Sequence, residues 1–256
     1  MIKKIILAIL IFMPLCVSDI FAENSGRWIP IGGAHSNSYR FIDGSTINYD
    51  SENGEFIYWV KEVNSKGEIR DISKIKASPK NKTCLQVYTK IYWSKKLDEE
   101  LNRIRNRNLM LILPQSDIEQ EVNFLCEKYH KPYVWGHKEH SWVKAVINTN
   151  EYFDDTWSVC ADTFLKNETT NEYIMFAKVD TFAKNENYSY TLPSFFIVNI
   201  KKGYFKWPGG ETDSLLIPES NNELFFSVSK KIITATPENA YPLSKIKGSE
   251  FIKLGE

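Results

Sequence analysis

The chain has 256 residues, and its 32 basic and 32 acidic residues give a formal net charge of zero. A neutral chain lacks the long-range attraction to polyanions that nucleic-acid-binding proteins use. Nucleic acid is therefore not an expected partner, and contact with an anionic membrane is expected to be peripheral at most. The length fits one large domain or two modest ones, and the composition leaves a homo-oligomer open.

The N-terminus has the organisation of a secretory signal peptide. Lys3 and Lys4 precede an apolar run at residues 5–17 that is too short to span a bilayer, and the small residue Ala22 marks the expected cleavage point. Residues 1–22 are therefore predicted to be removed during export. The remaining 234 residues carry a net charge of −1 and three cysteines.

Strand signals dominate the chain up to residue 93. EFIYWVKEV, residues 55–63, is rich in aromatic and β-branched residues and is bounded on both sides by turn sequences. In TCLQVYTKIYW, residues 83–93, apolar and polar residues alternate as they do in a half-buried strand. Short strands joined by turns predict antiparallel sheets.

Two helices are predicted next, and strands again after them. KKLDEELNRIRNR, residues 95–107, carries a helical apolar stripe. SDIEQEVNFLCEKY, residues 116–129, begins with a capping box, in which Ser116 and Glu119 each satisfy a backbone donor at the helix start. Further strands are predicted for SFFIVNIKKGYFKW, ELFFSVS and KIITA, at residues 194–207, 223–229 and 231–235.

The strand at residues 55–63 has a counterpart in EYIMFAKVD, residues 172–180. Landmarks around the two strands recur in the same order: an upstream tryptophan, an aspartate, and a downstream aromatic strand end. They are Trp28, Asp43 and residues 90–93 in the first copy, and Trp142, Asp162 and residues 204–207 in the second. The repetition predicts two tandem modules.

The predicted fold is accordingly α+β. We expect a first module at residues 23–132, a linker at residues 133–141, and a second, divergent module at residues 142–256. Each module is expected to be an antiparallel β-sheet with a helix packed on it, and the helix is well marked only in the first.

The linker is rich in histidine. His130, His137 and His140 lie within eleven residues together with Glu139, and these side chains are of the types that bind zinc. The segment shows no helical periodicity that would place them on one face, so we expect a solvated linker and assign no metal ligand. Cys160 is expected to be a small buried residue of a strand and not a catalytic thiol.

No catalytic or cofactor-binding motif is present, so no enzymatic activity, catalytic residue or cofactor is predicted. The three cysteines that follow the signal peptide predict one disulfide with one thiol left over. Cys84 opens a predicted strand and Cys126 lies near the end of the capped helix of the same module, which favours this pair. By the chain-entropy model, closing the 42-residue separation adds about 4 kcal/mol of stability.

Several of these segments together resemble the surface-adhesin protein E-like family of exported bacterial proteins. The resemblance covers residues 27–129 and rests on RWIPIG (27–32), YRFIDGSTI (39–47), FIYWVKE (56–62), Cys84, and LPQSDIEQEVNFLC (113–126). It implies an antiparallel sheet with a C-terminal helix, tied by one cysteine in the sheet and one in the helix. It also implies a location at the bacterial surface and binding of host matrix or plasma proteins such as laminin and vitronectin.

The sequence thus predicts an exported, non-enzymatic protein of the cell envelope or surface, acting in binding or adhesion with an unnamed ligand. The alternative from another class is an exported metal-dependent hydrolase, with a site assembled from His137, His140 and Glu139 between the modules. A structural envelope subunit without a soluble ligand is a third possibility.

Overall fold

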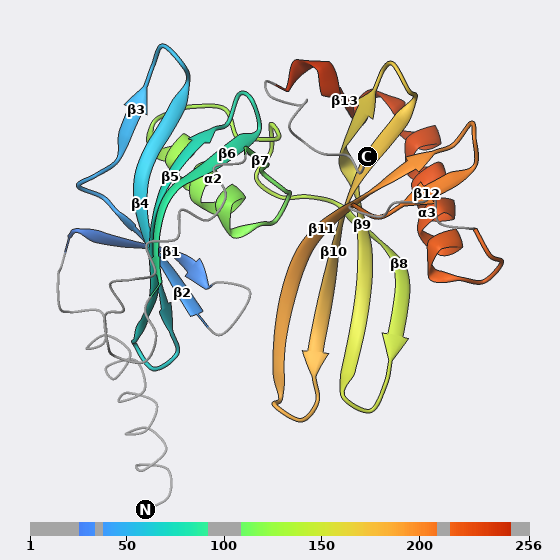
Figure 1. Ribbon diagram of the computed structural model, residues 1–256, viewed down its shortest axis with the longest axis horizontal. Coiled ribbons are helices and arrows are strands. Elements are labelled where there is room, and N and C mark those ends of the chain that lie inside the picture. The colour runs from blue at the N-terminus through green and yellow to red at the C-terminus, as the bar shows by residue number, and fades with distance from the viewer. Residues whose placement is uncertain (1–25, 34–37, 92–108, 209–215, 247–256) are drawn as a thin grey trace, which may run out of the picture.

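The computed structural model describes residues 26–33, 38–91, 109–208 and 216–246 (Figure 1). The predicted signal peptide at residues 1–22 and the predicted helix at residues 95–107 lie outside these ranges. None of the described helices is long and apolar enough to cross a lipid bilayer. Within the described residues the architecture is α+β, with mostly antiparallel strands in two sheets and the two α-helices α2 and α3.

The first sheet has seven strands in the order β1-β2-β4-β5-β6-β7, with β3 paired to β4, and all of its pairings are antiparallel. Its strands are β1 (Trp28–Gly33), β2 (Ser38–Asp43), β3 (Asn48–Asp50), β4 (Glu55–Asn64), β5 (Ile69–Ser78), β6 (Thr83–Ile91) and β7 (Met110–Leu111). The predicted strand EFIYWVKEV is β4. It buries Phe56, Tyr58 and Val60 completely on one face, as strand alternation requires.

Helix α2 (Asp117–Lys128) packs on that face of the first sheet. The predicted Ser116 cap is confirmed, because its hydroxyl accepts a hydrogen bond from the Glu119 amide at 3.1 Å, whereas the Glu119 carboxylate accepts from the Gln115 amide and not from the Ser116 amide. The helix is anchored by the fully buried Glu121, whose carboxylate accepts hydrogen bonds from Arg40 on β2 at 2.6 Å and from the hydroxyl of Tyr58 on β4 at 2.8 Å.

The second sheet has the order β12-β11-β10-β9-β13, with β8 paired to β9. Its strands are β8 (Trp142–Thr149), β9 (Phe153–Asn167), β10 (Glu172–Ala183), β11 (Tyr188–Asn199), β12 (Tyr204–Lys206) and β13 (Ala240–Pro242). Only β13 runs parallel to its neighbour, β9. Helix α3 (Asn221–Ala235) packs on this sheet, and two short 3-10 turns, η2 (Pro237–Asn239) and η3 (Leu243–Lys245), flank β13.

The strand predictions for residues 223–229 and 231–235 are wrong, because both segments belong to α3. Aromatic and β-branched residues favoured a strand, but Phe225 and Ile232 are buried at a helical spacing of seven residues and pack against the second sheet. Ser220 caps this helix by accepting from the Glu223 amide at 3.3 Å. A helix nevertheless packs on each of the two sheets, as expected, but the one on the second sheet lies where strands were predicted. The predicted strand at residues 194–207 is divided between β11 and β12 by a turn.

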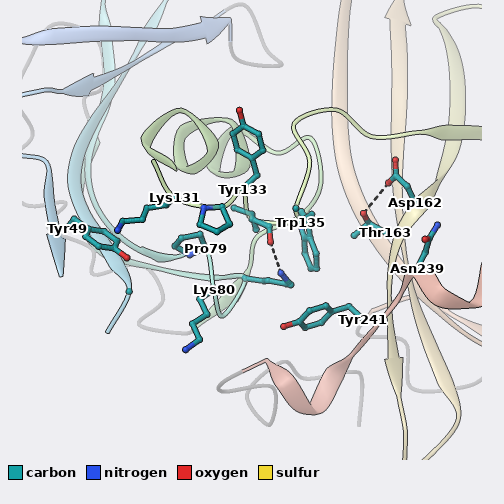
Figure 2. A pocket seen from close by; sticks show the side chains of 15 residues that line it. Tyr49, Pro79, Lys80, Lys131, Tyr133, Trp135, Asp162, Thr163, Asn239 and Tyr241 are labelled. Carbon is teal, nitrogen blue, oxygen red and sulfur yellow. Dashed lines mark hydrogen bonds between the residues drawn. The ribbon is translucent and has the colours of Figure 1, made fainter. Parts of the chain in front are cut away.

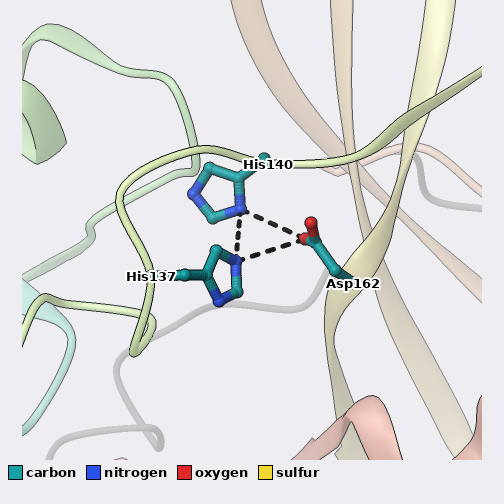
Figure 3. A group of neighbouring side chains, drawn as sticks. All are labelled: His137, His140 and Asp162. Carbon is teal, nitrogen blue, oxygen red and sulfur yellow. Dashed lines mark hydrogen bonds and ion pairs between the residues drawn. The ribbon is translucent and has the colours of Figure 1, made fainter.

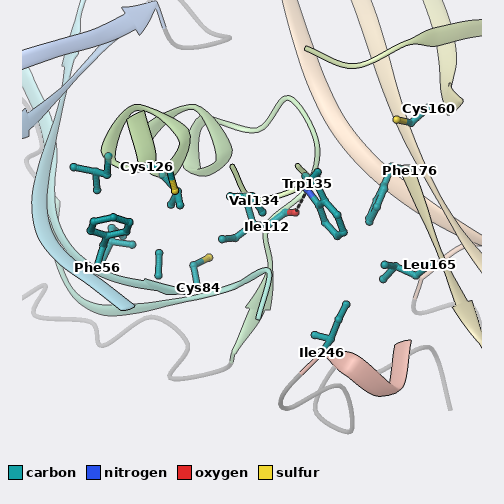
Figure 4. Packing of buried hydrophobic residues seen from close by; sticks show 14 of the residues in the cluster. Phe56, Cys84, Ile112, Cys126, Val134, Trp135, Cys160, Leu165, Phe176 and Ile246 are labelled. Carbon is teal, nitrogen blue, oxygen red and sulfur yellow. Dashed lines mark hydrogen bonds between the residues drawn. The ribbon is translucent and has the colours of Figure 1, made fainter. Parts of the chain in front are cut away.

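The linker predicted at residues 133–141 is not solvated throughout, because Val134 and Trp135 are buried. The indole of Trp135 donates to the carbonyl of Ile112 at 3.2 Å, and its ring lies 5.1 Å from the ring of Phe176 on β10. One apolar cluster consequently runs from Phe56 in the first sheet to Phe176 in the second (Figure 4). The two sheets share this core, and a second cluster lies between the second sheet and α3.

Cys84 and Cys126 are free, buried thiols of the shared cluster, so the predicted disulfide is not formed in this structure. Both side chains lie in the space between the first sheet and α2 (Figure 4). Burial raises the pKa of each thiol to about 12. Cys160 is also free and fully buried, in agreement with its predicted burial.

A candidate metal centre between the two sheets

Four side chains with metal-binding atoms converge where the segment after α2 meets β9. His137 and His140 come from the segment, and Cys160 and Asp162 come from the strand. The β8–β9 pairing sets Trp142 opposite Cys160, and the Ala161 amide donates to the Ser141 carbonyl at 2.8 Å. This register carries the end of the segment along β9 and brings His140 beside Asp162.

Three of the ligand atoms form a nearly equilateral triangle (Figure 3). Nε2 of His137 and Nδ1 of His140 are 3.0 Å apart, and Oδ1 of Asp162 lies 3.4 Å from the first and 3.2 Å from the second. A tetrahedral Zn²⁺ with nitrogen and oxygen ligands at about 2.0–2.2 Å places neighbouring ligand atoms about 3.3–3.6 Å apart. The triangle therefore has nearly the dimensions of one face of a zinc site.

Cys160 lies beside this triangle but outside the group whose ligand atoms are all within 4.8 Å of one another. Its Sγ lies 3.1 Å from Oδ1 of Asp162 and 3.9 Å from Nδ1 of His140. In a tetrahedral zinc site a thiolate sulfur lies about 3.6 Å from a neighbouring nitrogen. The register of β9 on β10 shifts between Val159 and Phe164, and within this bulge the Cys160 thiol donates to Oδ1 of Asp162.

Glu119 on α2 fixes the orientation of one imidazole. Its Oε1 lies 2.8 Å from Nε2 of His140, and both side chains are only 3% exposed. A carboxylate only accepts, so the proton of a neutral His140 ring sits on Nε2 and the lone pair of Nδ1 points into the triangle. Nδ1 then needs a donor or a cation at this point, which can be the Nε2–H of His137 at 3.0 Å, a proton shared with Asp162, or a metal ion.

The electrostatics of the cluster fit that requirement. Burial opposes the charged imidazolium, but Glu119 and Asp162 outweigh it and raise the pKa of His140. Burial likewise opposes the charge of Asp162, yet hydrogen bonds from the Ser141 amide, Cys160 and His140 lower the pKa of this carboxyl to about 2. Burial and the nearby Asp162 charge raise the pKa of Cys160, so its thiol stays protonated until a metal ion displaces the proton.

Further polar contacts hold the ligands in place. The Ser141 amide donates to Oδ2 of Asp162, which leaves Oδ1 directed at the histidines. The Thr163 hydroxyl lies 3.1 Å from Oδ1 of Asp162 and 3.2 Å from Nε2 of His137. Side-chain exposure is 36% for His137 and 25% for Asp162, so solvent can reach the centre from this side.

Only part of this group could be predicted from the sequence. His137 and His140 were candidate ligands, and their side chains are in contact. Glu139 is exposed and takes no part in the triangle, and His130 lies exposed just after the end of α2. Asp162 was identified only as a landmark of the repeat, and Glu119 only as a helix cap. The signal that could have found the set is the pair of short spacings H-x-x-H and C-x-D, the second of them on a strand.

Relatives give no guide to the role of this cluster. No family model matches the chain, and neither a curated protein nor a solved structure matches it.

Proposed function

We propose that this protein is an exported, non-enzymatic binding protein of the cell envelope or surface that holds one divalent transition-metal ion, Zn²⁺ in the first place, between its two sheets. The main support for a metal site is the convergence of His137, His140 and Asp162, whose atoms Nε2, Nδ1 and Oδ1 lie 3.0–3.4 Å from one another. Two imidazoles, a carboxylate and a thiol form a donor set that suits zinc better than the oxygen-seeking ions Mg²⁺ and Ca²⁺.

Cys160 would give the metal a structural role. If its Sγ moved into the triangle and bound, four protein atoms would fill the tetrahedron, and no position would be left for a water molecule or a substrate. Glu119 ties the same centre to α2 on the first sheet. A bound metal ion would thus hold the segment at residues 137–140 against β9 and connect the two sheets.

The hydrolase alternative is favoured by one observation. Asp162 and Thr163 also line a pocket of about 530 Å³. If Cys160 stayed protonated, the two histidines and Asp162 would leave an open position near that pocket, where a metal-bound water could act as a nucleophile. X-ray absorption at the zinc edge separates the two roles, because one sulfur neighbour supports the structural site and four nitrogen or oxygen neighbours support the hydrolase.

Metal content tests the proposal. Residues 23–256 are purified, loaded with zinc, dialysed against metal-free buffer and analysed by mass spectrometry. We expect about one zinc ion per chain, and we expect His137→Ala and Asp162→Asn to lose it. His130→Ala is the matched control and should keep it, because His130 lies outside the cluster. A metal-free chain, or zinc retained by both ligand variants, would refute the metal site.

We further propose that the two sheets are divergent copies of one module, as the sequence repeat predicts. In support, β1-β2-β4-β5 and β8-β9-β10-β11 are antiparallel meanders of the same order, and a Ser-x-x-Glu-capped helix follows each. The resemblance of residues 27–129 to the surface-adhesin protein E-like family supports a surface location. In a crystal structure, superposing the two meanders should overlay Trp28 on Trp142, and a superposition that places them on different strands would contradict the duplication.

A further inference from the structure

The pocket of about 530 Å³ that borders the metal centre has a wall of aromatic rings and a group of lysines (Figure 2). Its rings belong to Tyr49, Tyr133, Trp135 and Tyr241, and its lysines are Lys80, Lys82 and Lys131. The two sheets and the segment between them all contribute to it. Its volume lies within the range of small-molecule sites in proteins, about 300–1,000 Å³.

Lys82 is unusual among these side chains because it is a buried cation, with 8% of the residue exposed. Its Nζ donates to the Val134 carbonyl at 2.6 Å and lies 4.8 Å from the ring centre of Trp135 and 4.4 Å from that of Tyr241. Within the described part of the chain, no carboxylate lies within ion-pair distance of it. An ammonium has three donors, and among the described residues only the Val134 carbonyl accepts from this one.

Lys131 repeats the arrangement at the opposite side of the pocket. Its Nζ lies 4.6 Å from the ring centre of Tyr49, again with no ion pair to a described carboxylate. Asp162 is the only acidic side chain among the lining residues, and its oxygens are already bound by Ser141, His140 and Cys160. The charge that the pocket offers to a ligand is therefore positive.

Burial of an ammonium without a counter-ion is unfavourable, and desolvation lowers the pKa of Lys82 to about 8. The aromatic faces offset part of that cost. A ligand that brings a negative oxygen would offset more of it, by accepting a charge-assisted hydrogen bond from the ammonium. The rings around the lysine would meanwhile pack against a flat apolar body.

We propose that this pocket binds a small aromatic carboxylate, with the carboxylate at Lys82 and its ring packed against the aromatic wall of the pocket. The site is distinct from the four metal ligands apart from the shared wall at Asp162 and Thr163. It does not require the metal, so the proposal stands or falls separately from the zinc centre.

Matched probes test the proposal on the wild-type protein. 2-Naphthoate, naphthalene-2-carboxamide and 2-naphthylmethylamine share one ring system and carry a negative, a neutral and a positive group. Isothermal titration calorimetry, with and without zinc, should give a Kd for 2-naphthoate at least about tenfold lower than for the amide, and lowest affinity for the amine. No binding of 2-naphthoate, or equal affinity for the three probes, overturns the proposal.

Variants locate the site. Lys82→Met keeps the length of the side chain and removes its charge, and it should raise the Kd for 2-naphthoate about tenfold or more. Lys230→Met on α3 is the matched control, because Lys230 is exposed and does not line the pocket, and its Kd should stay within about twofold. An unchanged Kd in folded Lys82→Met overturns the assignment. If that variant does not fold, the probe comparison on the wild-type chain decides.

Discussion

Glu119 has two roles that a single substitution can separate. Its Oε1 accepts from Nε2 of His140 at 2.8 Å, and its Oε2 accepts from the Gln115 amide at 2.5 Å, ahead of α2. Glu119→Gln keeps the shape of the side chain but leaves one acceptor oxygen and one NH₂ donor. The amide therefore cannot accept from both partners, and either His140 or the helix start loses its hydrogen bond.

The expected effect on zinc binding follows from the burial of this contact. Both side chains are 3% exposed, so water cannot replace the lost carboxylate. Loss of such a supporting hydrogen bond lowers metal affinity about 10- to 100-fold, which corresponds to about 1.4–2.7 kcal/mol. The loss should be smaller than that of a ligand such as His137, whose removal should abolish tight binding.

Competition titration against a fluorescent zinc chelator measures the affinities, and urea unfolding in excess chelator measures the effect on the metal-free fold. Glu127→Gln is the matched control, because Glu127 lies on the same helix, is 57% exposed and pairs only with Lys138. A Kd for Glu119→Gln within twofold of the Glu127→Gln value would refute the role of Glu119 at the centre. A loss of folding stability without a loss of zinc affinity would mean that Glu119 acts only at the start of the helix.

Three further predictions concern the fold. Arg40→Met should lower the unfolding free energy by about 3–5 kcal/mol, because it leaves the buried Glu121 charge unpaired. Adding Glu121→Gln to this variant should restore at least half of the lost stability, and denaturant titrations measure both values. The pKa of Lys82 falls from 10.5 to about 8 on folding, so the folded chain binds fewer protons than the unfolded chain between these values. The wild type should accordingly gain stability relative to Lys82→Met as the pH rises from about 8 to about 10, and urea unfolding at both pH values should show it. After oxidation of the purified protein, non-reducing peptide mapping should find Cys84 joined to Cys126, because both thiols lie between the first sheet and α2, and a Cys126 link to any other cysteine would contradict the pairing.

Local patterns predicted the elements whose chemistry lies within a few residues. EFIYWVKEV is β4, and the Ser116 and Glu119 box starts α2. Helix α3 was missed although Ser220 and Glu223 form the same kind of box, because the aromatic and β-branched content of residues 223–235 favoured a strand. Packing of that segment on the second sheet decided its conformation.

The candidate site could be predicted only where its residues are close in sequence. His137 and His140 are three positions apart and were noticed together. The pairing of β8 with β9 places Cys160 and Asp162 beside these histidines, and the packing of α2 places Glu119 there. Neither the strand register nor the helix packing can be read from a single sequence. A pattern search finds ligands on one segment, whereas this centre draws on three.

The C-terminal segment returns to the core that the two sheets share, and this has a consequence for the order in which the fold forms. Strand β13 pairs with β9, and Leu243 and Ile246 then join the cluster that contains Trp135. About 110 residues separate Trp135 from Ile246. At a synthesis rate of about 5–20 residues per second, the part of this apolar surface that Leu243 and Ile246 cover stays open for about 6–22 seconds after Trp135 is made. During that time it is a surface on which a holding chaperone can bind.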